Sequence, residues 1–294
     1  MGTILALAAA LLYGTADFLG GAAARRARPL AVLAITAPAG AAIMVVSAVV
    51  ASAAGVGGHA TAGLGGSAGL AGVAWGAAAG IAGAAGLLTF YAGFSVAPMS
   101  VVAPISALAS ALLPLGVAIA QGERLSPAVI AGGVICLAAV GLVSLERKTE
   151  ARSAADRLRG LGYGLASGIM FGLFFLFFRS AGAAGVLWPV AVARLAGTLI
   201  AIGACLALRV RPAWSGTERA ALPMALASGV IDASANVCYV LATRSGLFGI
   251  AVVVTALYPG MTVLLARFVL GERMRWVQRI GLILAGVGLV LVTI

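Results

Sequence analysis

Charged residues are scarce in this sequence. Only 9% of its 294 residues are Asp, Glu, Lys or Arg, whereas 63% are hydrophobic, and a soluble domain carries roughly 25% charged residues. So few ionisable groups cannot cover the surface of a protein in water. We therefore expect most of the surface of this protein to face lipid. Backbone polar groups in lipid must be paired within the chain, which leaves helices or a closed barrel. The apolar stretches run for about 20 residues without strand-like alternation, which predicts membrane-spanning helices.

Side chains that hold metals or phosphates are equally rare. His59 is the single histidine, and the three cysteines lie inside apolar runs, where small core residues are expected. Neither a metal-ligand spacing nor a phosphate-binding G-x-x-x-x-G-K-[ST] motif is present. The sequence therefore predicts no metal, no cofactor and no ATP-driven step within the chain.

Basic residues outnumber acidic ones by 19 to 8, for a net charge of +11. They stand in short clusters between apolar runs, as in the cytoplasmic loops of membrane proteins, so we expect no nucleic-acid partner. The clusters occupy the odd-numbered loops, and the largest lies within 146–160. This pattern predicts that both termini lie outside the cytoplasm.

Apolar runs divide the chain into about ten expected transmembrane helices. Their approximate ranges are 3–22, 30–54, 69–93, 97–120, 127–145, 161–180, 188–208, 222–243, 247–270 and 276–294. We therefore expect an all-α membrane protein, with a first unit over 1–145, a basic cytoplasmic linker over 146–160 and a second unit over 161–294.

The two units end alike. The first continues from Phe90 to Gly122-Glu123-Arg124, the second from Tyr239 to Gly271-Glu272-Arg273, and one more apolar run follows each. Five helices carry the chain across the membrane, so a second similar unit must be inverted. Inverted repeats are common in secondary transporters, with the solute site near the midplane between the halves.

These motifs also carry a resemblance to a known family. The Leu-Leu-Tyr-Gly opening at 11–14, the two Gly-Glu-Arg elements and the run from Pro189 to Arg194 are similar to the EamA-type ten-helix transporters of the drug/metabolite transporter superfamily. The resemblance implies a plasma-membrane carrier, often an exporter of amino acids or other metabolites. Many members have a Glu-Pro pair in the fourth or ninth helix, where this chain has Tyr258-Pro259 in the ninth and no acid in the fourth.

Polar side chains within a span are functional candidates by default. Asp232, Asn236 and Tyr239 share one face of the eighth span. Asp232 could bind a substrate amine or a coupling proton, or form a structural ion pair with Arg194 of the seventh span. Arg194 could equally contact a substrate carboxylate.

Further candidates come from other spans. Tyr13 and Asp17 stand four residues apart on the first helix, where Asp17 could line a cavity or reach the interface. Tyr91 and Tyr258 are expected in the cavity wall, together with Tyr239. Glu123 is expected to be structural, pairing locally with Arg124.

Glycines spaced every four residues along the sixth span, from Gly160 to Gly172, predict close helix packing. Pro259 predicts a bend in the ninth span.

Taken together, these features predict a monomeric secondary transporter in the plasma membrane, of the prokaryotic inner-membrane kind. We expect alternating access of two inverted repeats to move a small metabolite, an amino acid or a drug-like solute, in the export direction, with protons as a possible coupling ion. An intramembrane enzyme and a non-transporting scaffold are the alternatives. An enzyme would need a nucleophile–base pair or a metal cluster in the spans, and a scaffold would gain nothing from the inverted symmetry.

Overall fold

The computed structural model describes residues 1–24, 26–54, 66–96, 99–143, 154–182, 185–210, 216–245, 248–269 and 275–293. The regular structure within these ranges is helical, so the predicted all-α fold is confirmed. A short 3₁₀ helix, η2 (Gly216–Ala221), precedes α8. The α-helices are α1 (Gly2–Ala24), α2 (Pro29–Ala53), α3 (Gly66–Val96), α4 (Met99–Ala120), α5 (Pro127–Val143), α6 (Ala154–Gly182), α7 (Leu187–Ala207), α8 (Leu222–Ser245), α9 (Phe248–Thr255), α10 (Tyr258–Val269) and α11 (Trp276–Thr293).

The helices reproduce the ten expected spans. Seven described segments are long and apolar enough to cross a membrane, and three shorter apolar helices lie in α4, α5 and α11. α9 and α10 together form the ninth span, which is interrupted at residues 256–257. Pro259 has no N–H to donate to the Thr255 carbonyl, the residue at which α9 ends. The predicted bend in this span is therefore confirmed.

One boundary differs from the expectation. The linker was expected to extend to residue 160, but α6 begins at Ala154, so its first two turns are charged and helical. Nη1 of Arg159 lies 3.9 Å from Oδ1 of Asp156, one turn earlier on this helix. Residues 144–153, the rest of the linker, lie outside the described part of the chain.

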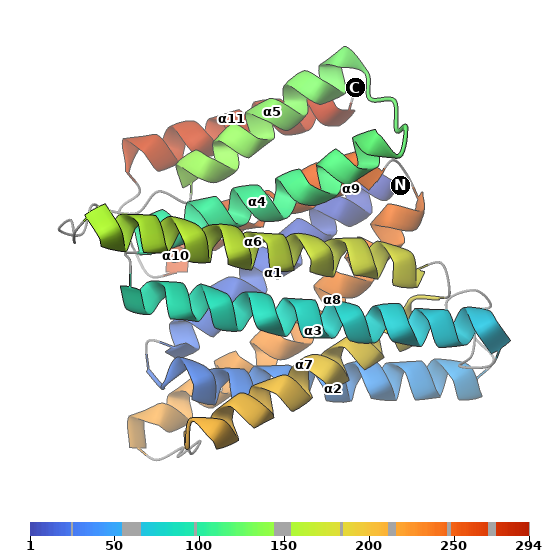
Figure 1. The fold of residues 1–294 in the computed structure, drawn as a ribbon, viewed down its shortest axis with the longest axis vertical. Helices are drawn as coiled ribbons and strands as arrows, with labels where there is room; N and C mark the ends of the chain where they lie inside the picture. The colour runs from blue at the N-terminus through green and yellow to red at the C-terminus, as the bar shows by residue number, and fades with distance from the viewer. Residues whose placement is uncertain are drawn as a thin grey trace.

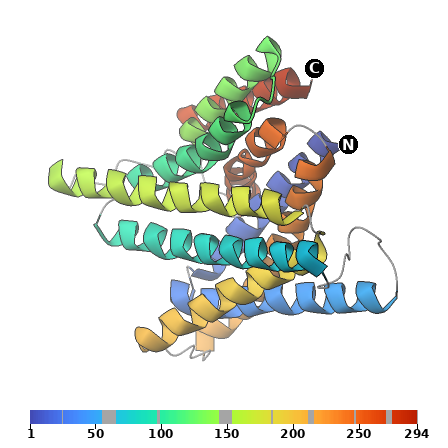
Figure 2. The same ribbon diagram turned by 45° about the vertical axis from the view of Figure 1, so that its right-hand side comes forward.

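The spans lie side by side in one bundle (Figure 1). α5 and α11 pair at one side of it and α2 and α7 at the other, an arrangement that the turned view keeps (Figure 2). α1, α3, α6 and α8 fill the middle, and both chain termini lie at the same end of the bundle (Figure 1). We call this the terminal end.

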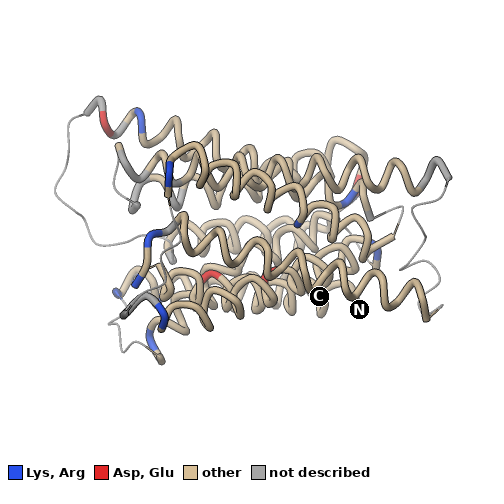
Figure 3. The backbone as a smooth tube through the Cα atoms, turned by 90° about the horizontal axis from the view of Figure 1, so that it is seen from below, with Lys and Arg blue, Asp and Glu red and all other residues tan. Residues whose placement is uncertain are grey.

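The other end of the bundle is rich in arginine, as Figure 3 shows, and we call it the basic end. The described arginines there are Arg26, Arg28, Arg159, Arg209, Arg219, Arg267, Arg275 and Arg279. At the terminal end the described arginines are Arg124, Arg179 and Arg244. The charge asymmetry expected from the sequence is thus present across the bundle.

The two halves pack by one pattern. α3 packs against α6 as α8 packs against α1, and α3 packs against α7 as α8 packs against α2. α4 packs against α6 as the α9–α10 segment packs against α1. In this pattern α1 corresponds to α6, α2 to α7, α3 to α8, α4 to the α9–α10 segment and α5 to α11. The corresponding helices α2 and α7 also pack against each other, and so do α5 and α11. In Figure 1, α1 and α6 run in opposite directions, and so do α2 and α7.

Glycines permit two equivalent helix crossings. A Cβ on Gly80 would overlap the carbonyl oxygen of Ala193, where α3 crosses α7. A Cβ on Gly229 would overlap the carbonyl oxygen of Thr36, where α8 crosses α2. Small residues of this kind let helix backbones approach closely in lipid. The predicted glycine face of α6 is also used, because Gly164, Gly168 and Gly172 pack directly against α4.

Candidate functional site

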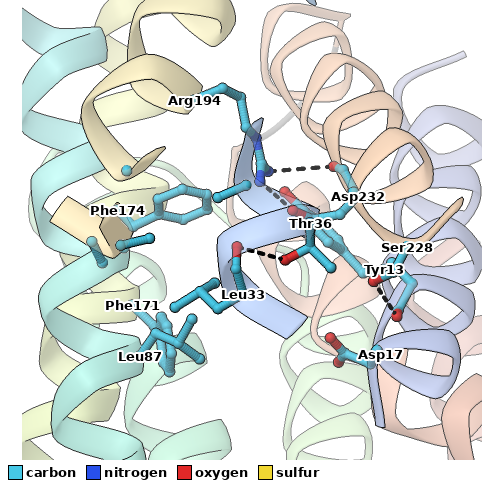
Figure 4. A pocket seen from close by; sticks show the side chains of 18 of the residues that line it. Tyr13, Asp17, Leu33, Thr36, Leu87, Phe171, Phe174, Arg194, Ser228 and Asp232 are labelled. Carbon is cyan, nitrogen blue, oxygen red and sulfur yellow. Dashed lines mark hydrogen bonds and ion pairs between the residues drawn. The ribbon is translucent and has the colours of Figure 1, made fainter. Parts of the chain in front are cut away.

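A cavity of about 350 Å³ lies in the middle of the bundle (Figure 4). Residues of α1, α2, α3, α4, α6, α7, α8 and α10 line it, so both halves of the chain contribute. From Tyr13 and Arg194 near mid-membrane, the lining continues to Ala24 and Val32 at the basic end. The cavity is therefore placed on the basic side of the bundle's centre.

Each helix presents one face to this cavity. On α1 the lining residues are Tyr13, Asp17, Gly20, Gly21 and Ala24, with Ala16 beside them, which follow the three- and four-residue spacing of a helix face. Gly21 has open space where a Cβ would stand. The small residues on this face leave room for solute along α1.

An ion pair joins two walls of the cavity. Arg194 on α7 donates from Nη1 to Oδ2 of Asp232 on α8, as the sequence allowed. Its Nη2 also lies 3.4 Å from the Asp232 carbonyl oxygen. The Arg194 side chain is 17% exposed and that of Asp232 31% exposed. The aspartate is therefore the more accessible partner from the cavity.

A second polar chain lies behind this pair. The Tyr13 hydroxyl donates to Oδ1 of Asn236 over 2.7 Å, and Nδ2 of Asn236 donates to the Asp232 carbonyl oxygen over 2.7 Å. Asn236 is fully buried. These bonds hold α1 against α8 and orient the Tyr13 ring at the cavity wall.

Asp17 differs from Asp232 in its surroundings. Its carboxylate points into the cavity from α1 and is exposed there (Figure 4). Among the described residues, none donates a hydrogen bond to it or forms an ion pair with it. Asp17 lies seven residues before the end of α1, which places it about 10 Å from the basic end. It is an acidic side chain at membrane depth, turned toward space that a solute can enter.

Aromatic side chains form much of the apolar wall: Tyr13, Phe171, Phe174, Phe175 and Tyr258. The Tyr13 ring packs edge-on against Phe175 and Tyr258, with centroids 6.2 and 6.3 Å away. Hydroxyl groups are present at Thr36, Ser110 and Ser228. The lining thus combines aromatic faces with a few polar groups, as small-molecule sites generally do.

A packed cluster closes the space between the cavity and the terminal end. It contains Phe178, Val186, Val190, Tyr239, Val240, Phe248 and Val252, all buried. Contacts between the halves lie beyond it: Nη1 of Arg179 donates to Oε1 of Gln121 over 2.7 Å, and its guanidinium lies 4.1 Å from the Phe248 ring centroid. Gly249 N–H donates to Oε1 of Glu123 over 2.9 Å, a partner in the other half of the chain rather than the neighbouring Arg124 expected from the sequence.

The structure brings most of the expected residues together. Tyr13, Asp17, Arg194, Asp232 and Tyr258 all line the cavity.

Two expected residues lie elsewhere, and a third is not described. Asn236 and Tyr239 are fully buried behind the wall, because their face of α8 packs against α1 and α6; the Tyr239 hydroxyl lies 3.3 Å from the Phe175 carbonyl oxygen. Tyr91 belongs to α3, but its side chain lies outside the described part of the structure.

Sequence reasoning missed the aromatic wall of α6 and the hydroxyls of Thr36 and Ser228. Phe171-Gly172 on α6 matches Tyr13-Gly14 on α1, since Gly172 packs against α4 and Gly14 against α10. Aligning the first helices of the two halves would have revealed Phe171 as the counterpart of Tyr13.

A crystal structure described only as "Crystal structure of protein" superposes with a TM-score of 0.79 over 99% of this chain and 95% of its own, at 21% sequence identity. This likeness shows that the whole chain has a fold already seen in a solved structure. No curated protein matches the chain. Residues 158–294 match the EamA-like transporter family. The matched segment, the second unit of the chain, is thus similar to the EamA-like transporters, the family that the motifs of the whole sequence resemble.

Proposed function

We propose that this protein is a secondary transporter that carries a small solute through the central cavity by alternating access. The match of residues 158–294 to the EamA-like transporter family supports a membrane transporter. The observation that carries the finer proposal is the cavity itself, which lies between the two halves and holds charged groups at membrane depth. Charged groups in a membrane interior typically mark a solute or ion pathway.

The packing pattern supports two inverted repeats. Exchanging α1 with α6, α2 with α7, α3 with α8, α4 with the α9–α10 segment and α5 with α11 preserves the main helix contacts. The exchanged helices run in opposite directions where Figure 1 shows them clearly. Such a pair of halves can close either end of the cavity with equivalent contacts, which is the basis of alternating access.

The charge asymmetry supports an orientation. Basic loops remain in the cytoplasm, so the basic end is assigned to the cytoplasm and both termini to the outside. The cavity then opens toward the cytoplasm, and the terminal end is the closed gate. Loading from the cytoplasm agrees with export of a metabolite or drug-like solute across a plasma membrane.

Opening of the terminal end requires specific contacts to break. The hydrogen bonds Arg179–Gln121 and Gly249–Glu123 each cross between the halves there. Neither side chain of Arg179 or Glu123 touches the cavity. Their proposed role is therefore to hold the closed gate and not to contact the solute.

Purified protein in proteoliposomes tests the proposal. Right-side-out and inside-out vesicles are loaded with a mixture of labelled amino acids and organic cations, and efflux is followed with and without a pH gradient. Saturable, protein-dependent flux of at least one solute is expected. Flux no faster than in protein-free liposomes for every solute would contradict transport.

A further inference from the structure

We propose that the cavity selects solutes with a single positive charge on an apolar, ring-sized body, and that Asp17 receives the charge. This inference rests on the proposed transport function and names the substrate class of that site. Its basis is the arrangement of the three charged side chains among the described residues of the wall: Asp17, Arg194 and Asp232.

The charge balance of the lining favours a cation. Arg194 and Asp232 neutralise each other through their ion pair. Asp17 then leaves the lining with one negative charge that no described residue compensates. A charged group within a membrane is unfavourable without a partner. A bound monocation supplies that partner.

The accessible charges favour the same sign. Among the described lining residues, Arg194 is the single cationic group; its side chain is only 17% exposed and is paired with Asp232. Both nitrogens of its guanidinium fork already face oxygens of Asp232. A solute carboxylate would have to displace this partner while facing the repulsion of Asp17. Anions, and zwitterions that need a carboxylate site, are therefore disfavoured.

The remaining wall suits an apolar body attached to the charge. Phe171, Phe174, Tyr13 and Tyr258 stand around the same space as Asp17. Aromatic faces attract organic cations within about 6 Å. A cavity of about 350 Å³ is near the lower limit of ligand pockets, roughly 300–1,000 Å³. The geometry thus fits a single-ring ammonium compound.

The test compares solutes that share one body and differ in charge. The permanent cation benzyltrimethylammonium, protonated phenethylamine, zwitterionic phenylalanine and anionic 3-phenylpropionate are each measured for equilibrium binding to the full-length protein in nanodiscs. Flux of benzyltrimethylammonium, which does not cross lipid unaided, is measured in proteoliposomes. The two cations are expected to bind at least about tenfold more tightly than the anion, since a charge-assisted contact contributes about 1.5–3 kcal/mol.

Variants assign the charge to Asp17. Asp17→Asn keeps the shape and removes the charge, and is expected to weaken benzyltrimethylammonium binding about 10- to 100-fold. Asp17→Glu restores the charge and is expected to recover most of the binding. Asp156→Asn removes a carboxylate at the start of α6, outside the cavity lining, and controls for a general loss of charge.

The outcomes separate this inference from transport itself. Equal or tighter binding of 3-phenylpropionate or phenylalanine, or an absence of binding by both cations, overturns the cation preference in the wild-type protein without any variant. Unchanged cation binding in Asp17→Asn overturns the role of Asp17. Flux of phenylalanine without flux of benzyltrimethylammonium would refute the substrate class while leaving the transporter intact. Absence of protein-dependent flux for all solutes would refute the proposed function.

Discussion

The Arg194–Asp232 ion pair should contribute measurably to the free energy of unfolding. The pair joins α7 to α8 at membrane depth, with side chains 17% and 31% exposed. Removing one partner of a fully buried pair costs about 3–5 kcal/mol, because the other charge is left uncompensated. The cavity exposes both groups in part, so we expect smaller costs here, about 2–3 kcal/mol.

The two single substitutions should differ. Asp232→Asn leaves the less exposed Arg194 unpaired, and we expect about 3 kcal/mol of lost unfolding free energy. Arg194→Gln leaves the more exposed Asp232, which cavity water can solvate, and we expect about 2 kcal/mol. The double variant leaves two neutral amides able to bond each other. Its cost should fall below that of Asp232→Asn alone.

Unfolding of the purified variants in mixed micelles, titrated with sodium dodecyl sulfate and followed by circular dichroism, measures these costs. The double-mutant cycle gives the coupling between the two side chains directly. Strictly additive costs, or a double variant less stable than either single one, would refute the ion pair as a structural link between α7 and α8.

Three further predictions concern packing, the buried polar chain and orientation. Gly229→Ala places a Cβ on the Thr36 carbonyl oxygen and should cost about 1–3 kcal/mol of unfolding free energy. The control Gly203→Ala meets nothing within 4 Å and should cost far less. Equal costs for the two variants would contradict the close crossing of α8 and α2. Tyr13→Phe leaves Oδ1 of Asn236 without its donor and should cost about 1–3 kcal/mol in the same titration; a neutral substitution would show that this bond adds nothing. Alkaline phosphatase fused after residue 294 in a bacterial host should be active, because the C-terminus is proposed to lie outside the cytoplasm. An inactive phosphatase fusion, together with a fluorescent fusion of green fluorescent protein at the same position, would contradict this orientation.

Much of the fold could be predicted from the sequence because lipid allows few solutions. Apolar runs of about 20 residues must be helices, and the observed helices occupy the expected ranges. The start of α6 was missed because Asp156 and Arg159 are too polar for a span, although they form its first turns outside the apolar region. Hydropathy shows which residues prefer lipid, but a helix can extend beyond the lipid into water, where its residues are polar.

The site was predictable in part for a related reason. Ionisable side chains in spans are rare enough to be noticed singly, so Asp17, Arg194 and Asp232 could be found in the sequence. Their different surroundings could not, because pairing depends on how α7 meets α8. Sequence spacing also could not distinguish the positions of Asp232 and Asn236, because the two residues share a helix face. Asp232 lines the cavity, whereas Asn236 is buried behind its wall.

Alternating access of the two halves is the central claim, and a reversible crosslink across the closed gate tests it most directly. With the three native cysteines replaced by alanine, Gln121→Cys and Arg179→Cys are joined by a cleavable bis-methanethiosulfonate linker, since the native side chains meet there. We predict that the crosslink abolishes flux of benzyltrimethylammonium, or of whichever solute the proteoliposome screen identifies, and that reduction restores it. Undiminished flux through the crosslinked protein would contradict the account.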